Sequence, residues 1–294
     1  MSDKLQLDRV AIFLMVIFCA IWGSQQVVIK FANAGISPLW QAGLRSMGAV
    51  VLVSLWSAVR GVKLFERDTT LIPGLLAGTL FALEFGLLYW ALQYTTASRG
   101  VIFLYTAPFM VALGAVWLLP NEHMRRAQWL GMALAFVGVL ALFGESLLLP
   151  AGTTWIGDLM MFCAAVFWAG TTLTIKVSAL SRVAPEKMLM YQLVVSALVL
   201  PAFAAMLGEP GIFAPTPAVW ASLAFQIVVV ATASYIGWFW LIRHYPVTRL
   251  SSFSFLTPVL GVVAGGVLLG EALTPAVFVA LGLVCTGIWI ANRP

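Results

Sequence analysis

The sequence predicts an all-α integral membrane protein, with ten transmembrane helices arranged as two inverted five-helix repeats around a central cavity. Three observations lead to this fold class. Hydrophobic residues make up 62% of the 294 residues, charged residues make up only 9%, and the mean hydropathy is +1.01, all outside the usual range for soluble domains. The apolar residues fall in runs long enough to cross a bilayer. One segment near the start of the chain is also repeated near its middle.

The apolar runs are bounded by charged residues, Pro or Gly, and each has about the length of a membrane-spanning helix. They are continuously apolar, which excludes the short alternating segments of a spanning β-barrel. The first run is too long for a signal-peptide core, so we expect it to be a retained helix. The ten expected spans are residues 10–31, 37–59, 71–94, 98–119, 126–144, 155–177, 185–206, 217–242, 247–269 and 275–292.

The segment 21–30 is echoed 146 positions later by the segment 167–176, and both contain a Trp and end in Lys. The echo continues at offsets of 149 or 150. Tyr89-Trp90, Arg99, Pro108 and Glu122 match Phe239-Trp240, Arg249, Pro258 and Glu271. We therefore expect two copies of one unit, residues 1–145 and 146–294. In a membrane protein, such a duplication is typical of a transporter built from two halves around a central site.

Lys and Arg residues indicate the orientation, because they accumulate in cytoplasmic loops. With both termini inside, the outer side receives Lys30 and Arg99, while Arg45 lies within a span. The inner side receives Lys4, Arg9, Arg60, Lys63, Arg67, Arg125, Arg126, Lys176, Arg182, Lys187, Arg243, Arg249 and Arg293. The net charge of +5 is then a topology signal and gives no reason to expect nucleic acid as a partner. Because five helices are an odd number, the second repeat enters the membrane from the opposite side.

The residues that carry the repeat also resemble a known family, the EamA domain of the drug/metabolite transporter superfamily. The resemblance rests on Trp22-Gly23, Arg45, the stretch 89–97, Pro108, Pro258 and Gly270-Glu271. It covers nearly the whole chain, as two such domains. Asn121-Glu122 departs from the pattern, which has Gly-Glu at this position, and the departure weakens any expectation that this loop works symmetrically in the two halves.

Within that family, the chain is most similar to bacterial aromatic amino-acid exporters of the YddG type, in part through its Trp-rich first and sixth helices. This resemblance implies a multi-pass protein of the bacterial inner membrane, with cytoplasmic termini, that exports aromatic amino acids and tolerates some toxic organic cations. The partners are then a small amphiphilic metabolite and the lipid bilayer.

Glu84 is the sharpest candidate for a functional residue, because it lies in the middle of the third span. An ionisable group at that depth costs about 2.5–3.5 kcal/mol on insertion scales, so it should face a cavity or a partner. It could bind a substrate ammonium group or take up a coupling proton. The alternative is a buried Glu that is hydrogen-bonded to neighbouring helices. Its repeat counterpart is Ser234, so the duplication alone does not require a carboxylate.

Arg45 is the second charge inside a span, eight residues into the second helix. A substrate carboxylate is one partner that it could have. Its place near the outer interface, where its long side chain could snorkel, and its place in the family pattern favour an architectural role.

Trp22 and Trp168 are related by the repeat and could line the transport pathway, because their rings stack on aromatic groups or accept a cation on the π-face. An interfacial belt is the alternative for tryptophans in general. Polar neighbours one turn further on and three aromatic residues of later helices complete the proposed substrate-binding set. These additional members are Gln25, Thr171, Tyr105, Tyr235 and Trp238.

Two matched prolines, Pro108 and Pro258, lie within spans, where each removes a backbone donor and predicts a kink, either static or acting as a hinge. Two GxxxG spacings formed by Gly261, Gly265, Gly266 and Gly270 predict close helix packing, within a monomer or between subunits. We expect a monomer and leave a dimer open.

The leading hypothesis is a secondary transporter that exports aromatic or other hydrophobic amino acids by alternating access. An exporter of lipophilic organic cations such as methyl viologen is the alternative. An intramembrane enzyme is a distant third. Asp158 has no second aspartate within the spans, and Ser24 lies far from the histidines, which both fall at predicted inner loops. The three cysteines lie within apolar spans without a Cys-x-x-Cys spacing, so no metal site is expected. No cofactor is expected either, and phosphate-binding loops for ATP are absent from the sequence.

Overall fold

The computed structural model describes residues 6–64, 66, 68–91, 94–95, 97–119, 122–144, 152, 154–269 and 275–293. The side chains of residues 26, 30, 97–99, 265, 268 and 269 are outside this description. Several residues used in the sequence prediction therefore lie outside the described part of the chain, either entirely or in their side chains. The first group is Lys4, Arg67, Asn121, Gly270 and Glu271, and the second is Gln26, Lys30, Arg99 and Gly265.

Nearly all of the described chain is helical, and it contains ten segments long and apolar enough to cross a membrane, one for each predicted span. This confirms the all-α membrane fold class. Seven spans are single helices: α1 (Arg9–Asn33), α2 (Pro38–Arg60), α3 (Leu71–Ala91), α6 (Arg126–Phe143), α8 (Thr154–Val177), α9 (Pro185–Met206) and α14 (Pro275–Asn292). Three are interrupted: α4 (Ala97–Leu104) with α5 (Ala107–Leu118), α10 (Pro217–Phe225) with the π-helical η2 (Gln226–Ser234) and α11 (Tyr235–His244), and α12 (Val247–Phe253) with α13 (Leu256–Leu269). A short 3-10 helix, η1 (Ala179–Arg182), follows α8.

Local sequence explains where several of these helices begin and end. Pro38 and Pro185 occupy the first positions of α2 and α9, where the missing N–H would have had no partner within the helix. Asp8 precedes α1, and its carboxylate accepts a hydrogen bond from the Ala11 amide at 2.9 Å. Gly61 ends α2 with φ +66°, a left-handed conformation that suits glycine.

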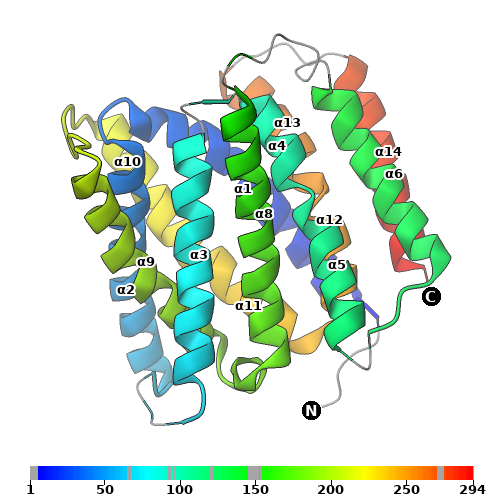
Figure 1. Ribbon diagram of the computed structural model, residues 1–294, viewed down its shortest axis with the longest axis horizontal. Coiled ribbons are helices and arrows are strands. Elements are labelled where there is room, and N and C mark those ends of the chain that lie inside the picture. The colour runs from blue at the N-terminus through cyan, green and yellow to red at the C-terminus, as the bar shows by residue number, and fades with distance from the viewer. Residues whose placement is uncertain are drawn as a thin grey trace.

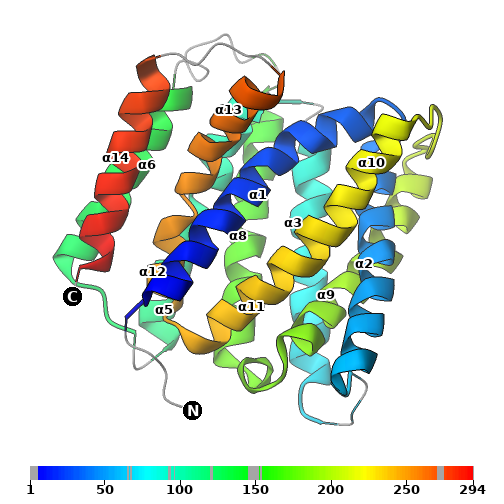
Figure 2. The same ribbon diagram turned by 180° about the vertical axis from the view of Figure 1, so that it is seen from behind.

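The helices pack as a bundle in which elements from the two halves of the chain alternate (Figure 1). α6 and α14 lie side by side at one edge, and α2 packs on α9 at the opposite edge, as both views show (Figures 1 and 2). Between these edges, α3 packs on α8 and α1 packs on α13. The start of α1 and the end of α14 lie at the same end of the bundle, which we call the terminal end (Figure 2).

Two helix crossings depend on glycine because the backbones approach closely. A Cβ added to Gly23 of α1 would lie 2.6 Å from the amide nitrogen of Gly261 in α13. At the α6–α14 crossing, a Cβ on Gly287 would lie 2.4 Å from the carbonyl oxygen of Gly131. Gly261, one of the predicted GxxxG residues, thus packs within the monomer, while the second GxxxG spacing ends at Gly270, outside the described residues.

Large apolar side chains cover the outside of the bundle. Trp117, Val59, Ile72 and Met206 are each more than three-quarters exposed, with Trp117 reaching 87%. Such exposure would be unfavourable in water, whereas lipid chains solvate these groups well. The surface is therefore that of a protein whose sides face a bilayer.

Candidate functional site

A central cavity lies between helices of both halves of the chain, and its lining combines many apolar and aromatic side chains with a few polar groups, as is typical of small-molecule pockets. All eight side chains that the sequence suggested for substrate binding line it. They are Trp22 and Gln25 of α1, Glu84 of α3, Tyr105 after α4, Trp168 and Thr171 of α8, and Tyr235 and Trp238 of α11. The fold thus brings together residues separated by more than 200 positions in the sequence.

Edge-to-face aromatic contacts build two walls of the cavity. The ring of Trp22 lies 5.5 Å from that of Trp238, at 85°, and 6.4 Å from that of Tyr235. Its indole N–H donates to the hydroxyl of Ser234 at 2.9 Å, which fixes the orientation of the ring. The ring of Trp168 meets that of Tyr105 at 5.8 Å and 85°. Each repeat-related tryptophan is therefore held by residues of the other half of the chain and presents apolar surface to the cavity.

Glu84 supplies the one carboxylate among the residues described as lining the cavity. Its side chain is 8% exposed, and no ion pair within 4.0 Å involves it in the described part of the chain. The phenol of Tyr235 and the guanidinium of Arg45 are near enough to interact with it electrostatically. A carboxylate in this setting is able to bind an ammonium group or to carry a proton.

Arg45 does not line the cavity. Its side chain is fully buried, and its guanidinium stacks on the ring of Phe85 at 4.2 Å. The expectation that the side chain snorkels toward an interface is therefore wrong. The side chain instead turns inward, because Phe85, which does line the cavity, offers a π-face to the cation.

Both matched prolines follow breaks in their spans. The fourth span is interrupted at Tyr105 and Thr106, just before Pro108, and the ninth at Ser254 and Phe255, just before Pro258. Tyr105 and Thr257 line the cavity beside these breaks. The interruptions therefore lie next to residues that line the cavity, where breaks in a spanning helix are tolerated better than against lipid.

Sequence reasoning missed several cavity residues. Gln192 of α9 lines the cavity and is fully buried, and a polar residue at the middle of an apolar span was a usable signal for it. Thr257 carried a similar but weaker signal. The apolar lining had no signal that distinguishes it from residues packed elsewhere, and comprises Ile29, Phe81, Phe85, Leu88, Leu104 and Phe239.

At the terminal end, the corner between α11 and α12 is fixed from three directions. The carboxylate of Glu122, from the α5–α6 connection, accepts hydrogen bonds from the amides of Val247 and Thr248 at 2.9 and 3.0 Å. The ammonium of Lys176 donates to the carbonyls of Ile242 and Tyr245 at 2.9 and 3.1 Å. These groups neutralise the exposed ends of the two helix dipoles, so they fix the corner between α11 and α12.

A third contact at this corner has a counterpart at the opposite end. The phenol of Tyr245 donates to Asp8 before α1, at 2.8 Å. Thr95, after α3, donates in the same way to Asp158 of α8, at 2.7 Å. Asp158 is thus engaged in a structural contact, which accounts for its presence near the start of a span.

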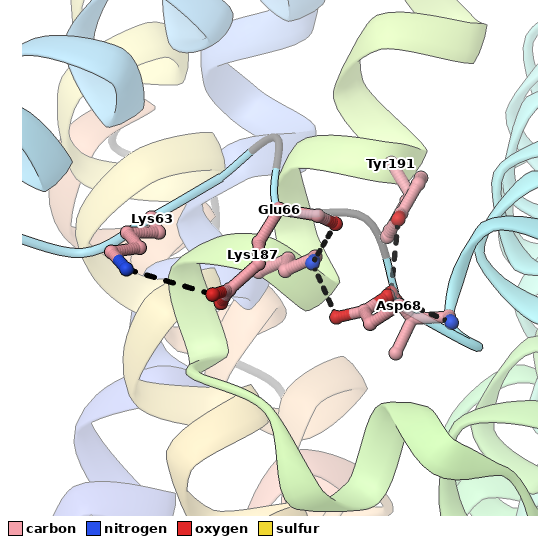
Figure 3. A network of polar contacts seen from close by, with 6 residues as sticks. Lys63, Glu66, Asp68, Lys187 and Tyr191 are labelled. Atoms are coloured by element: carbon pink, nitrogen blue, oxygen red, sulfur yellow. Dashed lines mark hydrogen bonds and ion pairs between the residues drawn. The ribbon is translucent and has the colours of Figure 1, made fainter.

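A further polar network joins the α2–α3 connection to α9 at the terminal end (Figure 3). The buried ammonium of Lys187 lies 2.6 Å from a carboxylate oxygen of Asp68 and 3.2 Å from the carbonyl of Glu66. The Thr70 hydroxyl donates to Asp68 and lies 3.0 Å from the Tyr191 hydroxyl. The hydrogen bond from Lys187, followed by those from Thr70, lowers the pKa of Asp68 to about 2.

Comparison with known proteins gives one family match over almost the whole chain. The EamA-like transporter family matches residues 9–144 and, separately, residues 155–293. A crystal structure of another protein, 20% identical in sequence, superposes with a TM-score of 0.81 over 97% of both chains. It supports the fold alone.

Among curated relatives, the "Uncharacterized transporter YoaV" of Bacillus subtilis is 25% identical over 92% of each chain. The "Probable amino-acid metabolite efflux pump" of Salmonella typhimurium is 29% identical and covers 95% of this chain and 93% of its own. The "Uncharacterized inner membrane transporter YedA" of Escherichia coli is 23% identical over 90% of this chain and 84% of its own.

Proposed function

Because the chain belongs to the EamA-like transporter family, we propose that it exports amino acids with aromatic or other large hydrophobic side chains. It is a multi-pass transporter of the inner membrane, consistent with its ten apolar spans and its relatives. One observation carries the substrate proposal, namely a cavity that combines aromatic walls with the carboxylate of Glu84. Aromatic rings suit a flat apolar side chain, and a carboxylate suits an α-ammonium group.

The transport mechanism that we propose is alternating access between two inverted repeats. The contacts Asp8–Tyr245 and Asp158–Thr95 support it, because they join matched residues. Asp158 lies 150 positions after Asp8, and Thr95 lies 150 positions before Tyr245. The two contacts lie at opposite ends of the bundle, as a twofold axis in the membrane plane would require.

One pair of matched residues supports the same arrangement. The hydroxyl of Ser196 in α9 donates at 2.9 Å to that of Ser46 in α2, and the two positions differ by the repeat offset of 150. In such a symmetry, equivalent residues meet each other only on the axis. The α6–α14 and α2–α9 pairs would then both lie along it.

We further propose that the terminal end faces the cytoplasm. Arg60, Lys63, Arg182 and Arg243 all follow or precede loops at that end, in agreement with the excess of basic residues in cytoplasmic loops. The contacts made by Glu122, Lys176 and Asp8 would then hold the cytoplasmic side closed.

The second candidate function is export of lipophilic organic cations. The Trp22 and Trp168 rings favour it, because a delocalised cation binds to the π-face of an indole while Glu84 balances its charge. An amino acid differs from such a cation in carrying a carboxylate, so the two candidates need different partners beyond Glu84.

Transport into proteoliposomes separates these candidates. Saturable uptake and counterflow of tryptophan and phenylalanine support the proposal, whereas uptake of methyl viologen without either amino acid supports the second candidate. Flux that never saturates would argue against a carrier of any kind.

The role of Glu84 is tested in the same vesicles with Glu84→Gln, with and without a pH gradient. Loss of gradient-driven uptake with intact exchange makes Glu84 a proton site. Loss of both modes for tryptophan indicates binding of the ammonium group, and unchanged transport in both removes Glu84 from the mechanism.

A further inference from the structure

The guanidinium of Arg45 is a buried cation without a counter-charge in contact. The side chain has no exposed surface, and none of its three nitrogens has a hydrogen-bond partner among the described residues. No carboxylate of the described chain lies within 4.0 Å of it. Its stacking on Phe85 at 4.2 Å compensates only part of the lost hydration.

Such an arrangement is costly, because a buried guanidinium normally has its planar set of five N–H donors occupied by an anion or by carbonyls. A buried cation of the neighbouring helix α9, Lys187, illustrates the normal case. Lys187 is equally buried but lies 2.6 Å from Asp68. Arg45 therefore lacks the kind of anionic partner that Lys187 has.

The surroundings of Arg45 connect it to the central cavity. Phe85, on which the guanidinium stacks, lines the cavity, and so do Glu84 and Tyr89, with which it interacts electrostatically. The ring of Phe85 thus lies between the guanidinium and the cavity.

Another unpaired polar atom lies in the same region. The side-chain oxygen of Gln192 is buried without a partner among the described residues, and Gln192 lines the cavity. Ser46, which follows Arg45, is hydrogen-bonded to Ser196, which lies one helical turn after Gln192. This bond places Arg45 and Gln192 in the same region. The unpaired donors of Arg45, on this side of the cavity, are suited to an anionic ligand.

We propose that Arg45 binds the carboxylate of a zwitterionic substrate after the ring of Phe85 moves aside. This inference rests on the proposed function and deepens it: Glu84 would bind the ammonium end, Arg45 the carboxylate end, and the aromatic walls the side chain. A substrate without a carboxylate leaves Arg45 unpaired, so this residue distinguishes amino acids from lipophilic cations.

The test compares tryptophan with tryptamine, which lacks only the carboxylate. Purified protein is titrated with each ligand, and the affinities are obtained from ligand-dependent thermal stabilisation. Arg45→Gln is expected to weaken tryptophan binding about tenfold, while tryptamine binding changes by less than about twofold. Arg60→Gln, which removes an arginine at the exposed end of the same helix, is the matched control and leaves both affinities unchanged.

An equal ratio of the two affinities in wild type and Arg45→Gln would overturn the proposal. If Arg45→Gln does not fold, Phe85→Ala decides, because an uncovered guanidinium should raise the preference for tryptophan over tryptamine, and an unchanged preference contradicts the idea. Replacing chloride by gluconate in the buffer tests whether Arg45 binds chloride instead. If gluconate lowers the thermal stability of the wild type but not that of Arg45→Gln, Arg45 binds chloride, and a carboxylate site is overturned. Failure of the wild type to move any amino acid instead refutes the proposed function itself.

Discussion

The Gly23–Gly261 crossing predicts a specific effect of one methyl group. In Gly23→Ala the new Cβ would lie 2.6 Å from the Gly261 nitrogen and 2.7 Å from the Thr257 carbonyl oxygen, both backbone atoms. Ordinary contact begins at 3.4 Å, so α1 and α13 must separate by about 0.8 Å. Neither atom can move without its helix.

Gly282→Ala is the matched control, because nothing lies within 4 Å of a Cβ at that position of α14. Both variants gain the same helix propensity, ~1 kcal/mol, so it cancels between them. Overpacking should make Gly23→Ala less stable than Gly282→Ala by about 1–3 kcal/mol.

Thermal unfolding in detergent, followed by the loss of the monomer peak in size-exclusion chromatography, measures this difference. We expect a midpoint for Gly23→Ala several degrees lower, at ~2–4 °C per kcal/mol for a chain of this size. Because Trp22 is the neighbouring residue and its N–H is bonded to Ser234 at 2.9 Å, the KM for substrate should also rise. Equal midpoints for the two variants would refute the reasoning about this crossing.

Three further predictions concern polar contacts. Glu122→Ala removes the acceptor of two backbone amides and should cost about 2–4 kcal/mol, measured by thermal unfolding. A double-mutant cycle of Ser46→Ala and Ser196→Ala should give a coupling of ~0.6 kcal/mol. Asp68→Asn should lower stability at neutral pH: the folded-state pKa lies below its usual value, so the stabilisation is present above pH ~4 and is lost as pH falls through about 2, where the two unfolding curves should meet.

Each of these predictions has a result that would contradict it, and the first also has a control variant. Glu66→Ala removes an exposed carboxylate in a 3.6 Å surface pair with Lys63 and should change stability by less than ~0.5 kcal/mol. A similar loss of stability in Glu66→Ala and Glu122→Ala would mean that the two amide hydrogen bonds of Glu122 do not stabilise the fold. Additive serine variants would remove the Ser46–Ser196 bond as a stabilising contact. A gap between wild type and Asp68→Asn that does not depend on pH would contradict an ionic origin.

Span positions were predictable because a bilayer imposes one length and one composition on every crossing segment. The ten predicted spans accordingly coincide with the ten apolar helices. Glu84 and Gln25 could be suspected for the same reason, since a polar group in an apolar run must find a cavity or a partner. The inverted relation of the halves and the roles of these residues stay predictions, and the transport experiments test the role of Glu84.

Features that depend on which face of a helix meets which neighbour could not be predicted. Arg45 was expected near an interface, yet it is buried against Phe85, because α2 packs that face inward on α3 and α9. Glu122 was noticed only as the repeat counterpart of Glu271, beside the departure at Asn121, since a hydrogen bond to an amide 125 residues away has no local signature. Long-range contacts of this kind follow from the packing of whole helices and not from any short pattern.

The Glu122 contact also bears on how the chain is made. A ribosome delivers Glu122 to the membrane well before Val247, so the acceptor is in place when the start of α12 emerges. The second half of the chain, synthesised alone, would lack this carboxylate and would leave two amides at the beginning of a helix without it. The start of α12, a helix of the late half, is therefore completed by a residue of the early half.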